Sequence, residues 1–366
     1  MTSAPHRDAG ATAGATTVAS ASPRRPWTAR VGRALAVDKI GAVYVWAGII
    51  VVFSLWAPET FPQVATAKQV VDSYAVTGLA ALAITVPLCA RVFDLSFAAV
   101  ITMTGVATAR LVTEGMGIVP AVAIGLLLGL AMGLVNAIVV VVMDIDSFIG
   151  TLATGLLMGA LVTMITHDTP VSNPVLFGNF SKIGQTSRWG ITLPVLYVTV
   201  VAVAIWYLLE HTATGRRLYA TGFNPDASRL AGVRVQRLRF MALLTSGFLS
   251  GVCGIVLAST LSSGSPTAGT PYLLPAFAAA FLGATQLKHG RFNAWGTMIA
   301  VLLLGTGITG LQLAGAPAWA RDMFVGIVLI ASLAVTGLQR RSTVTGQGSS
   351  RPQGGEESVS AGKEVT

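Results

Sequence analysis

Long apolar segments, each about the length of a membrane-spanning helix, recur along most of the chain. A helix needs about 20 predominantly apolar residues to cross the hydrocarbon core of a bilayer. Ten such segments are expected, at residues 40–57, 71–90, 95–113, 118–142, 147–166, 191–209, 240–262, 271–287, 293–313 and 322–338. The pattern predicts an all-α, polytopic membrane protein with about ten transmembrane helices. The short segment at 271–287 contains Pro271 and Pro275, which predicts a broken or tilted element.

Composition and charge agree with a membrane protein and indicate its orientation. The 366 residues are 53% hydrophobic and 11% charged, whereas soluble domains carry roughly 25% charged residues. Lys and Arg accumulate in the cytoplasmic segments of membrane proteins. With both termini in the cytoplasm, ten spans leave only five of the 24 basic residues outside, namely Lys68, Arg110, Lys182, Arg188 and Arg321. The net charge of +9 therefore indicates topology, and no nucleic-acid partner is expected.

The chain divides into a membrane domain and two polar tails. Residues 1–38 are rich in Ala, Thr, Ser and Pro and end in a basic run, which predicts a disordered cytoplasmic tail. Residues 39–338 form the expected transmembrane domain, and residues 339–366 a second disordered cytoplasmic tail. The first apolar run begins near Ile40 without a clean cleavage site, which argues against a cleaved signal peptide.

The segment 210–240 is the most polar and basic stretch between two predicted spans. Asn224 is a suitable N-cap for a short helix, Pro225 suits its first position, and Asp226 suits the positive end of its dipole. Gly232 can adopt the left-handed conformation that ends a helix. Lipid contact does not explain a capped helix of about two turns in a loop. We therefore expect this helix to bind another protein.

Small residues inside the spans indicate close packing. Glycines recur four residues apart at Gly125, Gly129 and Gly133, at Gly155 and Gly159, and at Gly247 and Gly251. This spacing lets helices approach each other in lipid, and we favour packing within one bundle over a dimer interface. Cys89 and Cys253 both fall in apolar spans and are interpreted as small core residues rather than a disulfide or a metal pair.

A few polar side chains near the predicted cytoplasmic ends of the spans have two interpretations each. They are Asp94 and Ser96 in FDLS, Asn136, and Ser147 and Thr151 in the segment DIDSFIGTLAT. Asp94 can cap the third span with Arg91 as a local partner, Asn136 can form an interhelical hydrogen bond, and Asp146 or Ser147 can cap the fifth span. Alternatively, these residues form a gate on a pathway through the membrane.

Two further stretches of the sequence bear on function. The outer loop 167–190 carries Phe177, Phe180 and Trp189, and is either a docking surface or an amphipathic loop at the membrane interface. The motifs GxxxxGK[ST], HExxH and GxSxG do not occur, and the four histidines do not cluster in the sequence. We therefore expect no catalytic, metal or cofactor site, and no enzyme.

The central loop resembles a known family. Asp226-Ala227-Ser228-x-x-x-Gly232 has the spacing of the EAA…G loop in permease subunits of binding-protein-dependent ABC importers. The surrounding TATGRRLYATGFNPDASRLAG is similar to the loop of the ribose/xylose/arabinose-type sugar permeases. FDLS at 93–96, FIGTLAT at 148–154 and FLGATQLKHGRFNAWGT at 281–297 match the same family in the same order. The resemblance covers roughly residues 70–335.

This resemblance implies a multi-pass, channel-forming subunit in the cell membrane that imports a monosaccharide, a pentose such as ribose. Its implied partners are an extracytoplasmic sugar-binding protein, two cytoplasmic ATPase subunits that hydrolyse the ATP, a second permease copy in a homodimer or heterodimer, and membrane lipid. The residues implied to couple the chain to the ATPase are Asn224, Pro225, Asp226, Ala227, Ser228, Arg229, Leu230, Ala231 and Gly232.

The sequence also departs from the family pattern. Arg91 and Val92 replace a usual glycine pair, and Ala284, His289 and Phe292 stand where the family prefers glycine. These departures leave the substrate open, with branched-chain amino acids, nucleosides and autoinducer sugars as alternatives. An ion-coupled secondary transporter is a different class, which typically carries an ionisable residue deep in a span. A non-transporting membrane scaffold explains neither the capped loop nor the spans.

Overall fold

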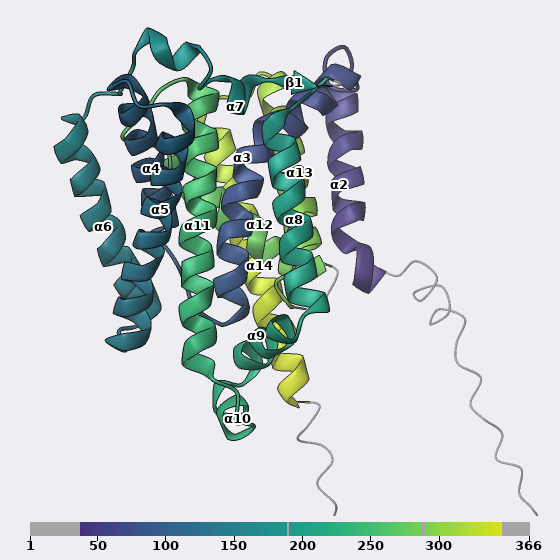
Figure 1. The fold of residues 1–366 in the computed structure, drawn as a ribbon. Helices are drawn as coiled ribbons and strands as arrows, with labels where there is room; N and C mark the ends of the chain where they lie inside the picture. Colours follow the sequence, from purple (N-terminus) through teal and green to yellow (C-terminus); the bar gives the residue numbers. More distant parts are fainter. Residues whose placement is uncertain (1–36, 189, 287–289, 346–366) are drawn as a thin grey trace, which may run out of the picture. The chain divides into compact units, whose positions relative to one another are not determined.

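A computed structural model describes residues 37–188, 190–286 and 290–345, which are mainly helical (Figure 1). A two-residue hairpin pairs β1 (Ser187–Arg188) with β2 (Ile191–Thr192). The helices are α2 (Val37–Trp56), α3 (Val64–Cys89), α4 (Phe97–Thr113), α5 (Ile118–Ala137), η1 (Ile138–Val142), α6 (Ser147–Thr166), η2 (Pro174–Phe177), α7 (Lys182–Gln185), α8 (Leu193–His211), α9 (Ala213–Phe223), α10 (Pro225–Leu230), α11 (Val235–Leu261), η3 (Thr270–Tyr272), α12 (Leu273–Gln286), α13 (Ala294–Leu313) and α14 (Trp319–Thr345). The predicted tails, 1–38 and 339–366, lie outside the described residues except where α2 and α14 extend into them.

Each of the ten predicted segments contains one long helix: α2, α3, α4, α5 with its π-helical continuation η1, α6, α8, α11, α12, α13 and α14. Within the described residues, six helices are long and apolar enough to cross a membrane, and three shorter apolar helices accompany them. The chain is an all-α, polytopic membrane protein, while the number of ten spans stays a prediction. The break expected at Pro271 is the 3₁₀ turn η3, which directly precedes α12.

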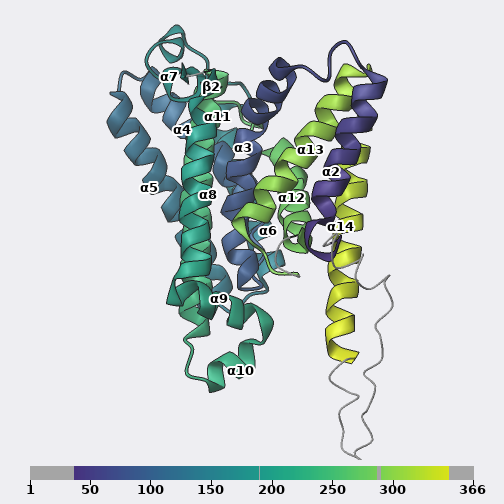
Figure 2. The ribbon, with the colours of Figure 1, turned by 90° about the vertical axis from the view of Figure 1, so that its right-hand side faces the viewer.

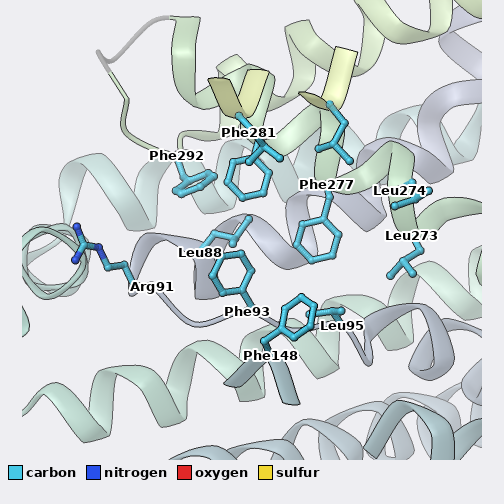
Figure 3. Close-up of a pocket in the computed structure, with 12 residues that line it drawn as sticks. Leu88, Arg91, Phe93, Leu95, Phe148, Leu273, Leu274, Phe277, Phe281 and Phe292 are labelled. Carbon is cyan, nitrogen blue, oxygen red and sulfur yellow. The ribbon is translucent and has the colours of Figure 1, made fainter. Parts of the chain in front are cut away.

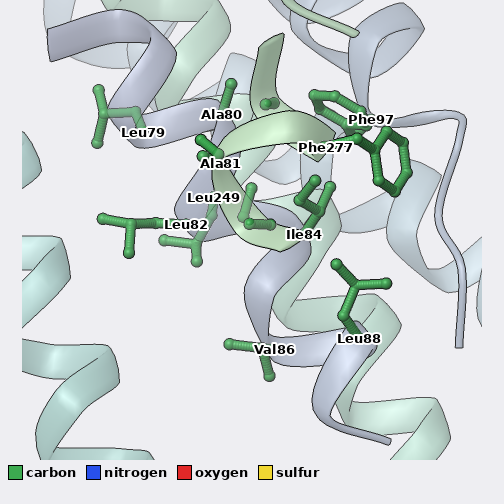
Figure 4. Close-up of a cluster of buried hydrophobic side chains, with 14 of the residues drawn as sticks. Leu79, Ala80, Ala81, Leu82, Ile84, Val86, Leu88, Phe97, Leu249 and Phe277 are labelled. Carbon is green, nitrogen blue, oxygen red and sulfur yellow. The ribbon is translucent and has the colours of Figure 1, made fainter. Parts of the chain in front are cut away.

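Helix α3 lies inside the bundle, where it packs against α8, α11, α12 and α13 (Figures 1 and 2). Every residue from Leu79 to Ile84 is at most 1% exposed. A helix that is apolar on all sides is buried, either in a protein core or in a membrane, and here other helices surround this part of α3. Figure 4 shows Leu79, Leu82 and Ile84 beside Leu249 of α11 and Phe277 of α12, which belong to the same buried cluster. This cluster is the main core of the bundle.

Helices α5 and α11 contact each other through their glycines. A Cβ added at Gly129 would lie 2.8 Å from the carbonyl oxygen of Gly247 and 2.9 Å from the Cα of Gly251. A Cβ added at Gly247 would lie 2.5 Å from the Cα of Gly133. The predicted packing within one bundle is confirmed for these two helices. Gly159 of α6 has no such neighbour among the described residues.

The two ends of the bundle carry different structures. Figures 1 and 2 show α9 and α10 at one end, and α7 with the β-hairpin at the other. Helix α11 begins beside α10 and ends beside α7. There, the Gln185 side chain donates to the carbonyl oxygen of Thr260 at 2.9 Å, and the Ser259 hydroxyl donates to that of Phe180 at 2.9 Å. One helix therefore connects both ends.

Candidate functional site

The short helix α10 has the caps that its sequence predicts. The Asn224 side chain accepts hydrogen bonds from the backbone N–H groups of Asp226 and Ala227, at 3.1 and 3.0 Å. Gly232 has φ +80°, the left-handed conformation that favours glycine. Its N–H donates to the carbonyl of Arg229, and the N–H of Val233 donates to that of Ser228, both at 2.9 Å. These two bonds form the Schellman motif that ends a helix.

The surface of α10 is largely free of contacts with the rest of the chain. Of the nine residues from Asn224 to Gly232, only Ser228 is buried and Pro225 is half-buried. Leu230 is 92% exposed, and Phe223, at the end of α9, is 80% exposed. The ion pair between Arg229 and Asp226, at 3.0 Å, is solvent-exposed and contributes little stability. Exposed apolar side chains beside arginines are typical of a protein–protein interface.

The other site is a cavity of about 680 Å³ within the bundle (Figure 3). It is almost wholly apolar, and the lining residues are Leu88, Arg91, Phe93, Leu95, Phe148, Leu273, Leu274, Phe277, Phe281, Phe292, Leu329 and Leu333. Arg91, the charged member of this set, lies at the edge of the group in Figure 3. Its φ of +55° is a conformation that non-glycine residues rarely adopt. Cavities of about 300–1,000 Å³ hold small molecules.

A row of five phenylalanines lines the cavity. The ring of Phe281 lies 5.4 Å from that of Phe292, 6.3 Å from that of Phe277 and 6.4 Å from that of Phe93, measured between centroids. Phe93 in turn contacts Phe148 at 6.4 Å. Phe93, Phe148, Phe281 and Phe292 come from FDLS, FIGTLAT and FLGATQLKHGRFNAWGT. Three separate sequence motifs therefore meet at one cavity.

Alternate residues of the segment 93–96 have opposite roles. Phe93 and Leu95 line the cavity, whereas Asp94 and Ser96 are at most 1% exposed and bond to the helices behind it. One carboxylate oxygen of Asp94 accepts from the N–H and the hydroxyl of Ser96, at 3.0 and 2.6 Å. The other accepts from the hydroxyl of Ser246 on α11 at 2.6 Å. Within the described residues Asp94 has no ion pair, and Arg91 is not its partner.

The five residues predicted as a gate come together at this segment. The Asn136 amide donates to the Ser96 hydroxyl at 2.6 Å and accepts from the Thr154 hydroxyl at 2.5 Å, which confirms the interhelical hydrogen bond. The hydroxyls of Ser147 and Thr151 accept from the backbone N–H groups of Phe93 and Leu95, at 3.1 and 3.0 Å.

None of these five residues is among those that line the cavity. These residues hold the wall of the cavity. Asp146, one of the two residues predicted to cap the fifth span, is the N-cap of α6. Sequence reasoning missed Ser246 and Thr154, and it also missed the phenylalanines. The recurrence of Phe in each family motif was the available signal.

The outer loop divides between core and surface. Phe180 is fully buried beside Leu176 and Ala258, while Phe177 is 66% exposed. Trp189 lies outside the described residues. A docking role for this loop stays a prediction that now rests on Phe177.

Comparison with known proteins identifies the family. The model of a family described as "Branched-chain amino acid transport system / permease component" matches residues 68–333. The chain belongs to this permease family. The permease is therefore a multi-pass protein of the plasma membrane, and a component of a transport system rather than an enzyme. No solved structure matches it.

Several curated relatives are sugar permeases. The permease is 32% identical to the ribose import permease protein of Escherichia coli (strain K12) over 292 residues, which cover 78% of this chain and 90% of the relative. It is 30% identical to the L-arabinose transport system permease protein of the same organism, over 81% of this chain and 89% of the relative. The D-allose transport system permease protein is 27% identical over 82% and 92%.

Proposed function

We propose that this permease is the membrane-spanning subunit of an ABC importer for a monosaccharide, a pentose such as ribose. The observation that carries the proposal is its similarity, over about four fifths of its length, to permeases named for ribose, arabinose and allose. The cavity between the phenylalanines is the proposed translocation path. Apolar walls with one charged group bind a sugar weakly, and a conducting path requires binding that is weak enough for release.

The two ends of the bundle are the proposed contacts for two different partners. Helix α10 faces the cytoplasm and is the contact for an ATPase subunit, because its exposed Leu230 and arginines can bind a groove on a protein surface. An extracytoplasmic binding protein delivers the sugar at the opposite end, where the η2–α7 loop exposes Phe177.

A second permease copy completes the path. Four apolar cavity residues are exposed in the single chain: Leu274 by 57%, Phe148 by 51%, Leu333 by 44% and Phe93 by 36%. A sugar path open to lipid would be unfavourable, because the hydroxyl groups of the sugar would lose their hydrogen bonds with water. A second copy that covers these residues would close the path on that side.

Two alternatives have specific support. The family description names branched-chain amino acids, so leucine competes with ribose as the substrate. Asp94 is a buried carboxylate among hydroxyl groups, which is also found at ion-coupling sites of secondary transporters. ATP-driven uptake of radiolabelled ribose after collapse of the proton gradient supports the importer. Uptake by this chain alone, driven by an imposed ion gradient, contradicts it.

Variants of α10 test the ATPase contact. Ala227 is exposed, and Gly232 has no atom within 4 Å of an added Cβ, so neither Ala227→Glu nor Gly232→Val clashes within the chain. Valine at Gly232 loses about 1–2 kcal/mol in the left-handed conformation, which loosens the end of the helix. We expect both variants to reach the membrane at wild-type abundance but to lose ATPase co-purification or ribose uptake. Arg229→Ala is the mild control. Wild-type transport by the first two variants would show that α10 is only a connection.

A further inference from the structure

The helix that leads into α10 has one face packed against the membrane helices. In α9, Gly215 and Leu218 are buried, Tyr219 and Gly222 are half-buried, and Arg217 is exposed. Residues 215, 218, 219 and 222 have the spacing of one helical face. This face contacts α3, α8 and α11. Because Asn224 alone separates α9 from α10, any displacement of α10 must act on α9.

The first contact of α9 is with the end of α3. A Cβ added at Gly222 would overlap the carbonyl oxygen of Cys89 and would lie 3.8 Å from the Cα of Ala90. Cys89 is the last residue of α3, and its neighbour Leu88 lines the cavity. The backbones of α9 and α3 are therefore in direct contact, without a flexible side chain between them.

The second contact is with the phenylalanine row. The Tyr219 hydroxyl donates to the carbonyl oxygen of Phe292 at 2.8 Å, and the Cys89 thiol donates to the same oxygen at 3.6 Å. Burial raises the pKa of the Tyr219 phenol, so the hydroxyl keeps the proton that it donates. The Phe292 ring lines the cavity and packs on Phe281. The guanidinium of Arg291 lies 5.6 Å from the Tyr219 ring centroid and holds the ring from another side.

We propose that α9 transmits the movement of α10 to the cavity, with Tyr219 and Gly222 as its two points of attachment. Tyr219 moves Phe292 through a single hydrogen bond, and Gly222 moves the end of α3 through backbone contact. Both attachments lead to cavity residues, Phe292 in one case and Leu88 in the other. The inference rests on the proposed ATPase contact at α10 and assigns the residues that act between that contact and the path.

The test measures the cavity directly and needs no knowledge of the sugar. Leu273 lines the cavity and is half-buried, and it is not among the residues that the second copy would cover. Both native cysteines are buried and stay in place. The L273C reporter is introduced into the full transporter, with its ATPase subunits in lipid nanodiscs, and its rate of reaction with a thiol reagent is measured with and without AMP-PNP. We expect AMP-PNP to change this rate. In Y219F the change should shrink about fivefold, the effect of losing one hydrogen bond.

Matched variants separate transmission from folding. Tyr207→Phe removes the hydroxyl of an exposed tyrosine on α8 and should leave the nucleotide response intact. Gly222→Ala should reduce the response, whereas Gly159→Ala, at a position with no neighbour among the described residues, should not. Every variant should still bind the ATPase and hydrolyse ATP. Y219F isolates the hydrogen bond, because it keeps the ring and its packing.

Two results overturn the proposal. One is a full nucleotide response in Y219F, and the other is a parental reporter that does not respond to AMP-PNP. Failure of the proposed function has a different signature, because Ala227→Glu would then leave ATPase co-purification and uptake unchanged. If Ala227→Glu abolishes both while Y219F responds like the parental chain, α10 is the ATPase contact and the transmission through α9 is wrong.

Discussion

Replacing Asp94 tests whether the polar network behind the cavity anchors the wall or carries an ion. The carboxylate accepts three hydrogen bonds from the buried residues Ser96 and Ser246. Asp94→Ala leaves all three donors without their acceptor. Asp94→Asn keeps the two bonds to one oxygen, and its amide can donate to the Ser246 hydroxyl, so that only the direction of one bond changes.

The expected costs of the two variants differ by about 1–4 kcal/mol. Hydrogen bonds inside membrane proteins average about 0.6 kcal/mol, so three lost bonds cost about 2 kcal/mol. Bonds to charged groups contribute at least about 1.5 kcal/mol each, which raises the cost to about 5 kcal/mol. Asp94→Asn should cost about 1 kcal/mol. Since Phe93 and Leu95 flank Asp94, the alanine variant should also loosen the cavity wall.

The assay compares the thermal unfolding midpoint of the purified permease with ATP-driven ribose uptake. We expect Asp94→Ala to lower the midpoint and most of the uptake, and Asp94→Asn to keep both near the wild type. If Asp94→Asn unfolds like the wild type but does not transport, the carboxylate acts through its charge and the anchor is the wrong explanation. If Asp94→Ala loses neither property, the network does not hold the wall.

Two further predictions concern topology and packing. Gln185 and Leu230 are exposed at opposite ends of the bundle. An impermeant thiol reagent should therefore label Q185C in intact cells and L230C only in inverted vesicles. Labelling of both cysteines in intact cells would contradict the predicted orientation. Gly247→Ala places a methyl group 2.5 Å from the Cα of Gly133, which should cost about 1–3 kcal/mol of stability and lower the unfolding midpoint. The control Gly326→Ala, whose added Cβ has no atom within 4 Å, should not lower the midpoint. Equal midpoints for the two variants would show that α5 and α11 separate readily.

The sequence was sufficient where the signal is local. The apolar segments predicted the long helices, and Asn224 and Gly232 predicted the two ends of α10, because caps involve residues only a few positions apart. The polar residues of the network were also recognisable as single polar groups in apolar surroundings.

Their partners were not recognisable, because Ser246 and Thr154 look like ordinary small residues that can bond within their own helix. The cavity is lined by residues of α3, α6, α12 and α14 and of the segments before α4 and α13, which no local pattern brings together. The attachment of α9 was missed although Tyr219 and Gly222 share a helical face with Gly215 and Leu218. The spacing of residues 215, 218, 219 and 222 is the local signal for this packed face, and the arginines of α9 lie between these positions.

The length of α11 has a consequence for how the two sides of the membrane are related. Its 27 residues form an unbroken helix of about 40 Å that begins five residues after α10 and ends among the residues that hold the outer loop. A continuous helix moves as a rigid rod when it tilts or rotates. In the proposed importer, a movement of the end of α11 beside α10 would therefore also move the end that is bonded to Phe180 and Gln185, so that one movement reaches both the proposed ATPase contact and the proposed binding-protein contact.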